Sequence, residues 1–503
     1  MRPAFTRPRV WLTVCGVACI LAGCDRVKSD EARETGAVTA ANRGKIPVST
    51  SSEEARQLRA QGLKLADQLR PHEARQLFEK AVAKDPKFAM AHYNLALASP
   101  NAKATTEHLN HAVALSESAS EGERLTILIF QAANNGDPAK SLEYSKQLVA
   151  EYPEDERAHL ILGNSHFFGQ QDYENARDEL QKAIDVEPDF SPAYNMLGYA
   201  HSALGEYGES EQAFTKYIEL VPNDPNPYDS YGELLMKTGR FDESIAQYRK
   251  ALSLDPHFVA SHFGIAADLL YQGKHDQAIA EAQKLDAAGQ NDGDRRFALF
   301  TKALVYADQG RTNAALKEIE KQYALAARIG DTATMSGDAE TMGVILLTAG
   351  RPDEARQRFE QALSLLANSG SAQEVKDDAN LGHHHNLGRA ALAEKDLPTA
   401  KTEAAAYLEG AKAKDNEFRI RQAHKLAGQV ATLERSYDQA IAELAQANQQ
   451  DPSVLYATGL AYQGKGDRAK AKELFRQAAE TYTLPTLDQA FIRAKARKAA
   501  AGA

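Results

Sequence analysis

The sequence predicts an all-α fold, an α-solenoid of about twelve helical hairpins placed one after another. One observation is a set of marker residues (glycine, an aromatic residue, alanine and proline) that returns at intervals of roughly 34 residues. The other is the helical spacing of the apolar residues between these markers. Because each hairpin of such an array packs only against its neighbours, a chain of 503 residues need not divide into several globular domains.

The clearest unit spans residues 225–258 and carries the residue types that a helical hairpin needs. Gly232 allows the first helix to approach its neighbour closely, and Gly239 supplies the turn between the two helices. Tyr248 is the large residue of the second helix, and Pro256 prevents that helix from continuing. These residues predict two antiparallel helices joined by a short turn.

Similar units follow one another through most of the chain. The unit at 89–121 departs most from the pattern, because Pro100 interrupts its first helix. Strong units span 55–88, 156–190 and 191–224 and recur around Gly343, Gly428 and Gly459, whereas weaker units span 89–121, 122–155, 259–295, 296–335 and 381–420.

The spacing of the units predicts two parts within the array. We expect residues 53–290 to form an array with units of roughly 34 residues, and residues 291–485 to form an array with longer units. The segment 287–294, rich in Gly, Asn and Asp, marks the expected change. Residues 486–503 are expected to form a capping helix and a tail that cover the last unit.

The order of the markers resembles the tetratricopeptide repeat, and the resemblance covers nearly all of residues 55–485. It implies a right-handed superhelix with a concave groove, lined mainly by the first helix of each hairpin, that receives peptides or helices of other proteins. Some members of the family hold an acidic chain end with Lys, Asn and Arg at successive groove positions. We do not expect that activity, because the corresponding residues differ in type. They are Leu160, Asn195, Asp229 and Phe263.

The resemblance also places candidate partner-binding residues on the groove side of the first helices. Large rings and amides suit an extended or helical segment with apolar anchors, because buried aromatic residues dominate the binding energy of interfaces. The alternative is that these rings pack between adjacent units as core. The candidates are Tyr93, Phe130, Leu160, Asn164, Phe168, Asn195, Tyr199, Phe263, Tyr271 and Phe300.

Charged residues add two further candidate sites. Asp229 and Glu233 lie one helical turn apart and form an acidic spot suited to Lys or Arg, the alternative being a solvated charge pair. The later part of the groove has a basic or polar character that suits an acidic segment. Its residues are His385, Arg389, Lys425 and Gln429.

Residues 1–23 have the features of an export signal, in which arginines precede an apolar stretch too short for a permanent transmembrane helix. The stretch ends in Leu-Ala-Gly-Cys, which resembles the lipobox of bacterial lipoproteins. The resemblance implies cleavage before Cys24 and attachment of lipid to its thiol, whereas the alternative is an ordinary secretory signal with an incidental cysteine. Residues 24–52 are polar and lack apolar periodicity, so we expect a lipidated flexible tether.

Composition and motifs exclude several classes of function. The formal net charge of −10 disfavours binding to nucleic acid, which would repel the chain. The sequence contains no Gly-rich phosphate loop and no Gly-x-Ser-x-Gly motif, so we expect neither an enzyme nor a bound cofactor. His383, His384 and His385 stand in a row, but successive helical residues point about 100° apart, and we therefore expect no metal site.

The sequence therefore predicts a lipid-anchored scaffold that binds segments of partner proteins in an envelope-associated process such as assembly, secretion or polymer export. The alternative is a periplasmic chaperone-like or regulatory subunit that holds a client in the groove. The lipid is expected to anchor the chain to a membrane with the array facing the periplasm. Asp25 resembles a retention signal of the inner membrane, which slightly favours that membrane over the outer one.

Overall fold

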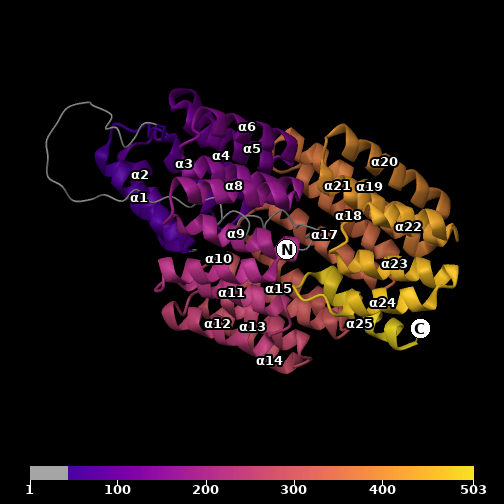
Figure 1. Cartoon of the computed structure of the whole chain (residues 1–503). Coiled ribbons are helices and arrows are strands. Elements are labelled where there is room, and N and C mark those ends of the chain that lie inside the picture. The colour runs from indigo at the N-terminus through magenta and orange to yellow at the C-terminus, as the bar shows by residue number, and fades with distance from the viewer. Residues whose placement is uncertain (1–43, 69, 503) are drawn as a thin grey trace. The chain divides into compact units, whose positions relative to one another are not determined.

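The computed structural model describes residues 44–68 and 70–502, and within these ranges the chain is built from helices without a strand (Figure 1). The predicted signal segment 1–23, the predicted lipidation site Cys24 and the first part of the predicted tether lie outside the described residues. Within the described ranges, no helix combines the length and the apolar character that crossing a bilayer requires.

The described residues form two compact units. The amino-terminal unit covers residues 44–230, and α11 (Pro225–Lys237) begins near its end. Its other helices are α1 (Glu53–Asp67), α2 (Pro71–Lys84), α3 (Ala89–Leu97), α4 (Ala102–Leu115), the short η4 (Ser116–Ser118), α5 (Glu121–Asn134), α6 (Pro138–Glu151), α7 (Glu156–Asn164), the π-helical η5 (Ser165–Gln170), α8 (Tyr173–Val186), α9 (Ser191–Leu204) and α10 (Tyr207–Leu220).

The carboxyl-terminal unit covers residues 231–502. Its helices are α12 (Phe241–Leu254), α13 (Val259–Tyr271), α14 (His275–Ala288), α15 (Asp292–Asp308), α16 (Thr312–Arg328), α17 (Thr332–Thr348), α18 (Pro352–Ala367), α19 (Gln373–Glu394), α20 (Leu397–Ala413), α21 (Glu417–Leu433), α22 (Tyr437–Ala445), α23 (Pro452–Lys465), α24 (Arg468–Ala479) and α25 (Leu487–Gly502).

Consecutive helices pair as hairpins, and α1 to α24 form twelve of them within the described residues. The predicted all-α solenoid of helical hairpins is thereby confirmed. From α15 to α21 the helices are 16 to 22 residues long, whereas those before α15 have 15 residues or fewer. The longer hairpins therefore begin at Asp292, while the division between the two compact units lies at residues 230 and 231.

A contact between a glycine of the first helix and a ring of the second holds many hairpins together. At five such glycines an added Cβ would lie only 2.4 to 2.8 Å from the nearest ring atom, closer than side-chain atoms approach in proteins. The rings themselves are almost completely buried, and burying one such ring stabilises the fold by roughly 1.5–3 kcal/mol. The five pairs are Gly62 with Phe78, Gly198 with Phe214, Gly232 with Tyr248, Gly343 with Phe359, and Gly459 with Phe475.

The substitution Gly198→Ala tests this packing. Its Cβ would lie 2.7 Å from the ring of Phe214, and overpacking of this kind costs roughly 1–3 kcal/mol. We expect a lower urea midpoint by circular dichroism and faster amide hydrogen exchange in α9 and α10. Gly208→Ala in α10 is the matched control, because nothing lies within 4 Å of its added Cβ. Equal midpoints for the two variants would contradict the packing argument.

Candidate protein-binding surfaces

Residues 44–50 form an extended strap on the amino-terminal unit, although the sequence predicts a flexible tether through residue 52. Hydrogen bonds and one ion pair fix the strap in place. They join its polar groups to carboxylates and a hydroxyl near the beginnings of α3, α5 and α7. The contacts join the Thr50 hydroxyl to Asp85 (2.6 Å), the Ser49 N–H to Glu123 (3.2 Å), the Ser120 hydroxyl to the carbonyl of Pro47 (2.7 Å), the Ile46 N–H to Asp155 (2.9 Å) and the Lys45 ammonium to Glu156.

Apolar side chains of the strap pack into the hairpin cores beneath it. Ile46 lies against the backbone of Gly122 and joins the cluster between α5 and α7, while Val48 packs on the core formed by α1 to α5. The strap thus combines apolar anchors with backbone hydrogen bonds, which is how an extended peptide is bound on a protein surface. This surface is already occupied by the chain itself.

Several predicted groove residues of the amino-terminal unit lie in the core. Tyr93 of α3 and Phe130 of α5 are buried and meet edge to face at 5.8 Å, so they join two successive first helices. Burial raises the pKa of the Tyr93 hydroxyl. Leu160 is 1 % exposed and belongs to the cluster of α7 to α10. For these three residues, packing between hairpins is the role that the structure shows.

The predicted amides are also buried. Asn164 ends α7 and Asn195 lies on α9, where its side-chain oxygen has no hydrogen-bond partner among the described residues. A buried amide oxygen without a partner costs roughly 1–3 kcal/mol.

Four aromatic residues at the edge of the same cluster remain partly exposed, and we call them the aromatic set. Phe168 lies in η5 and meets Phe167 at 4.8 Å, while Tyr199 on α9 meets Phe214 edge to face at 5.2 Å. The complete set is Phe168, Tyr173, Tyr194 and Tyr199. Partly exposed rings on a rigid support are the kind of anchor that binding partners use.

The π-helical turn η5 explains why Phe168 takes this place. In seven units the glycine of the first helix and the small residue of the second are twelve positions apart, as Gly198 and Ser210 are, whereas in the unit of η5 Gly163 and Ala176 are thirteen positions apart. The extra residue is accommodated as a π-helical turn followed by Gln171 in the left-handed region (φ 55°). Such turns often occur at functional sites.

The predicted acidic spot lies on α11. Asp229 is buried and Glu233 is partly buried, at positions one turn apart along the helix. Whether this spot binds a basic residue stays a prediction.

In the carboxyl-terminal unit, the predicted rings are buried as well. Phe263 of α13 meets Phe297 of α15 at 4.8 Å, and Phe300 is buried on α15. Tyr271 at the end of α13 is covered by residues 481–493, which we call the tail segment. Tyr271 therefore already contacts a segment of its own chain.

The predicted basic surface of the later hairpins is matched by acids of the same unit. Arg389 donates to Asp488 of the tail segment (3.3 Å), and Lys425 donates to Asp451 (3.1 Å). His385 packs on the ring of Tyr407 at 5.1 Å, and burial, reinforced by Arg389, Lys425 and Arg419, holds its pKa well below the usual value. Gln429 is partly buried. Arg389 and Lys425 thus each have an acidic partner within the unit, and whether these residues bind an acidic segment stays a prediction.

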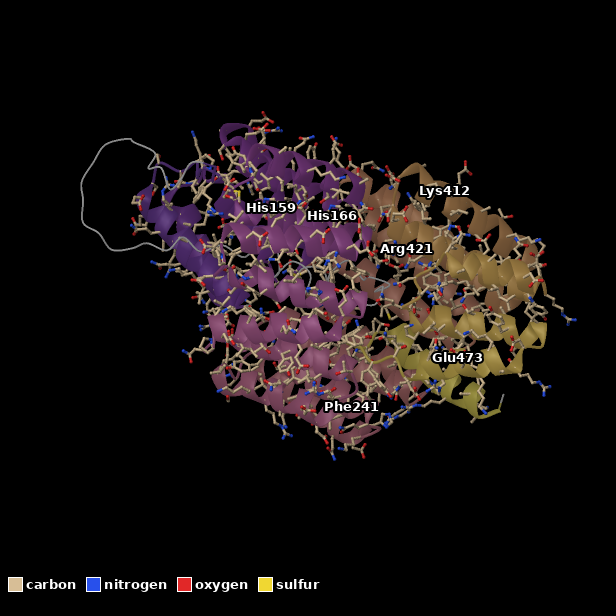
Figure 2. The ribbon with its side chains drawn as sticks, viewed as in Figure 1. His159, His166, Phe241, Lys412, Arg421 and Glu473 are labelled. Carbon is tan, nitrogen blue, oxygen red and sulfur yellow. The ribbon has the colours of Figure 1, made fainter. Side chains whose placement is uncertain are left out.

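A recurring histidine–glutamate pair is a feature that the sequence analysis missed. The histidine lies on the first helix of a hairpin and the glutamate lies 19 or 20 residues later on the second. Burial lowers the pKa of His159, but its hydrogen bonds to Glu179 and to the carbonyl of Pro153, together with the charge of Glu179, raise that pKa by more, with a net increase. Figure 2 shows His159 and His166 on the same helical stretch. The four pairs are His159 with Glu179, His262 with Glu281, His384 with Glu403, and His424 with Glu443.

The side chains of the consecutive histidines have different partners. His384 forms a hydrogen bond with Glu403, whereas His385 packs on the ring of Tyr407. Among the described residues, no three side chains of His, Cys, Asp or Glu are arranged to hold a metal ion.

In the hairpin of α3 and α4 the glutamate position is taken by His111. It stacks on His92 at 5.2 Å, and His108 lies 6.2 Å from His92. Burial lowers the pKa of both His92 and His108, and neighbouring histidines lower it further. The folded chain therefore binds fewer protons here than the unfolded chain, so stability is lost as the pH falls through the unfolded value of about 6.5.

We expect His111→Glu to reduce this loss, because the new carboxylate would attract a protonated His92 as Glu179 attracts His159. The difference between wild type and variant is expected to be ~0.5–1 kcal/mol at pH 5.5 and to shrink by pH 8. Urea unfolding at both pH values measures it. His72→Glu, at a partly exposed site on α2 outside the cluster, is the control. A pH-independent effect of His111→Glu would show that the cluster does not titrate with folding.

Comparison with known families places the repeat on several parts of the chain. Models described as tetratricopeptide repeat match residues 59–106, 165–225 and 453–483, and one described as TPR repeat matches residues 232–267. No curated protein matches the chain.

Solved structures of repeat proteins are similar to parts of the chain. A thermophilic TPR protein of Thermus thermophilus has 23% identity and a TM-score of 0.29, with 43% of this chain and 99% of that one covered. MamA from Desulfovibrio magneticus has 18% identity and a TM-score of 0.28, with coverage of 33% and 92%. YrrB, described as a TPR protein with an unusual peptide-binding site, has 18% identity and a TM-score of 0.25, with coverage of 37% and 93%.

Proposed function

Because the chain belongs to the tetratricopeptide-repeat family, we propose that it is a lipid-anchored scaffold that binds segments of partner proteins in an envelope-associated process. The partner segment is a peptide or helix with apolar anchors. The observation that carries this proposal is the aromatic set of the amino-terminal unit, four partly exposed rings packed against one apolar cluster, with Phe168 in a π-helical turn.

The aromatic set suits a protein partner better than a small molecule. Its rings come from α8, α9 and η5, so they are spread over three elements instead of converging on one point. Rings spread in this way fit an extended or helical segment that presents apolar side chains at several positions.

The membrane attachment rests on the sequence before residue 44. Leu21, Ala22, Gly23 and Cys24 match a lipobox, and several acyl chains on one cysteine hold a protein stably on a membrane. The expected site of action is the periplasmic side of the cell envelope, with the inner membrane slightly favoured. Nucleic acid is not a proposed partner, because the chain is acidic.

The double substitution Phe168→Ala and Tyr199→Ala tests the proposed surface. We expect crosslinked affinity capture from membranes to recover defined partners with the wild-type chain and to recover at least tenfold less with the variant, since central aromatic anchors contribute ~2 kcal/mol or more each. Ile329→Ala, at an exposed apolar residue outside the aromatic set, is the matched control. Both variants must keep the wild-type circular dichroism spectrum. Equal capture by the double variant and wild type would overturn the proposed surface.

Replacement of the lipobox cysteine tests the anchor separately. We expect Cys24→Ser to lose incorporation of a clickable fatty acid and to move from the membrane to the soluble fraction, because the thiol that accepts lipid is gone. Wild-type chain and Cys15→Ser, which lies within the predicted signal, are compared in parallel. Unchanged labelling of Cys24→Ser would remove the lipid from the proposal and leave the scaffold function in place.

A further inference from the structure

The tail segment returns to the beginning of the carboxyl-terminal unit. Residues 481–493 contact residues of α13 and α15 that lie 185 to 223 positions earlier in the sequence. A helix that only caps the last hairpin is expected to pack against α24. In Figure 1, α25 lies beside α24 and also beside α15. The segment therefore does more than cover the last hairpin.

The first half of the tail segment is not helical, and it is bound through an aromatic ring and its backbone. The ring of Tyr482 meets Phe241 (labelled in Figure 2) at 4.9 Å and Tyr271 at 5.3 Å. The hydroxyl of Tyr271 donates to the carbonyl of Thr483, and the N–H of Thr483 donates back to that hydroxyl at 3.3 Å. One side chain thus recognises both backbone groups of a residue, as peptide-binding surfaces do.

The second half is helical and is bound through an arginine. The guanidinium of Arg493 donates to both oxygens of Asp308, at 2.9 and 2.7 Å, and to the carbonyl of Leu270 at 2.9 Å. It also lies over the ring of Tyr271, 5.0 Å from its centre. Arg493 and Asp308 are only 5 % and 6 % exposed. A bidentate, buried pair of this kind is specific in geometry.

Two features indicate that this contact can be released. Arg493 and Arg389, the two arginines that hold the tail segment, each have a buried Nη1 without a hydrogen-bond partner among the described residues. Each such group costs roughly 1–3 kcal/mol, so the closed arrangement is not as stable as a fully satisfied one. In addition, the hairpins from α12 to α24 pack on one another independently of the tail segment, and we expect those contacts to persist when it leaves.

We propose that the face formed by α12, α13 and α15 is a segment-binding surface, and that the tail segment is its intramolecular ligand. By analogy with Tyr482 and Arg493, a competing partner segment carries an aromatic residue in a non-helical stretch and, eleven positions later, an arginine on a helix. Because the tail segment is tethered, its effective concentration is high, and such a partner binds only when the tail segment is released. The regulation of partner binding by the tail segment rests on the proposed scaffold function. The existence of the segment-binding surface on α12, α13 and α15 does not depend on that function.

The experiment uses the full chain and a fluorescent peptide that copies residues 478–500. We expect the variant Tyr482→Ala and Arg493→Ala, with its tail segment released, to bind the peptide at least tenfold more tightly than wild type by fluorescence anisotropy. Adding Asp308→Ala is expected to abolish that gain, because the bidentate acceptor is lost. A variant with the wild-type helical spectrum that fails to bind the peptide would overturn the proposal.

Hydrogen exchange of the wild-type chain provides a test that requires no variant. We expect the amides of Thr483 and α25 to exchange at least tenfold faster than those of α13 and α15, because the tail segment opens without unfolding the hairpins. Equal rates would show that the segment is a permanent part of the core and would overturn the proposal. Both tests concern residues 231–502, whereas Phe168 and Tyr199 lie in the other unit. Failure here therefore leaves the partner-capture result intact.

Discussion

A glycine of the first helix faces a large apolar side chain of the second, and this contact sets how closely the two helices of a hairpin approach. Phe359 reaches the backbone at Gly343 in this way, and Leu444 does so at Gly428. Because the large side chain fills the space that a Cβ would need, neither partner of a pair tolerates change alone. Hairpins with this contact therefore have a similar distance between their two helices. That distance sets where the aromatic and polar side chains of the first helices lie.

The hairpins could be predicted from sequence because their defining partners are close in the chain. Gly198 and Phe214 are 16 residues apart, so their spacing alone indicates two helices and a turn between them. The extra residue between Gly163 and Ala176 was also visible in the sequence. Its consequence was not, since one residue can be absorbed in a loop or in a helix, and only packing decides that it becomes a π-helical turn.

The candidate surfaces were harder to predict because their exposure depends on distant residues. Helical spacing places Tyr93 and Phe263 on one side of a helix, but it does not show that Phe130 and Phe297 of the next hairpins cover them. Tyr271 is covered by residues more than 200 positions later, which no local pattern reveals. The histidine–glutamate pairs, in contrast, had a readable signal in their constant separation, as His424 and Glu443 illustrate.

The strap changes how mechanical force enters the amino-terminal unit. The strap runs past the hairpins in the order opposite to their order in the chain. Lys45 and Ile46 contact the start of α7, Ser49 contacts α5, and Thr50 contacts the turn before α3. Tension on the chain ahead of Gly44 would thus act on α7 and α5 before it reached α1. The first hairpin of an array has a neighbour on one side only and is the easiest to fray. The strap shields this hairpin from load by passing the force to hairpins supported on both sides.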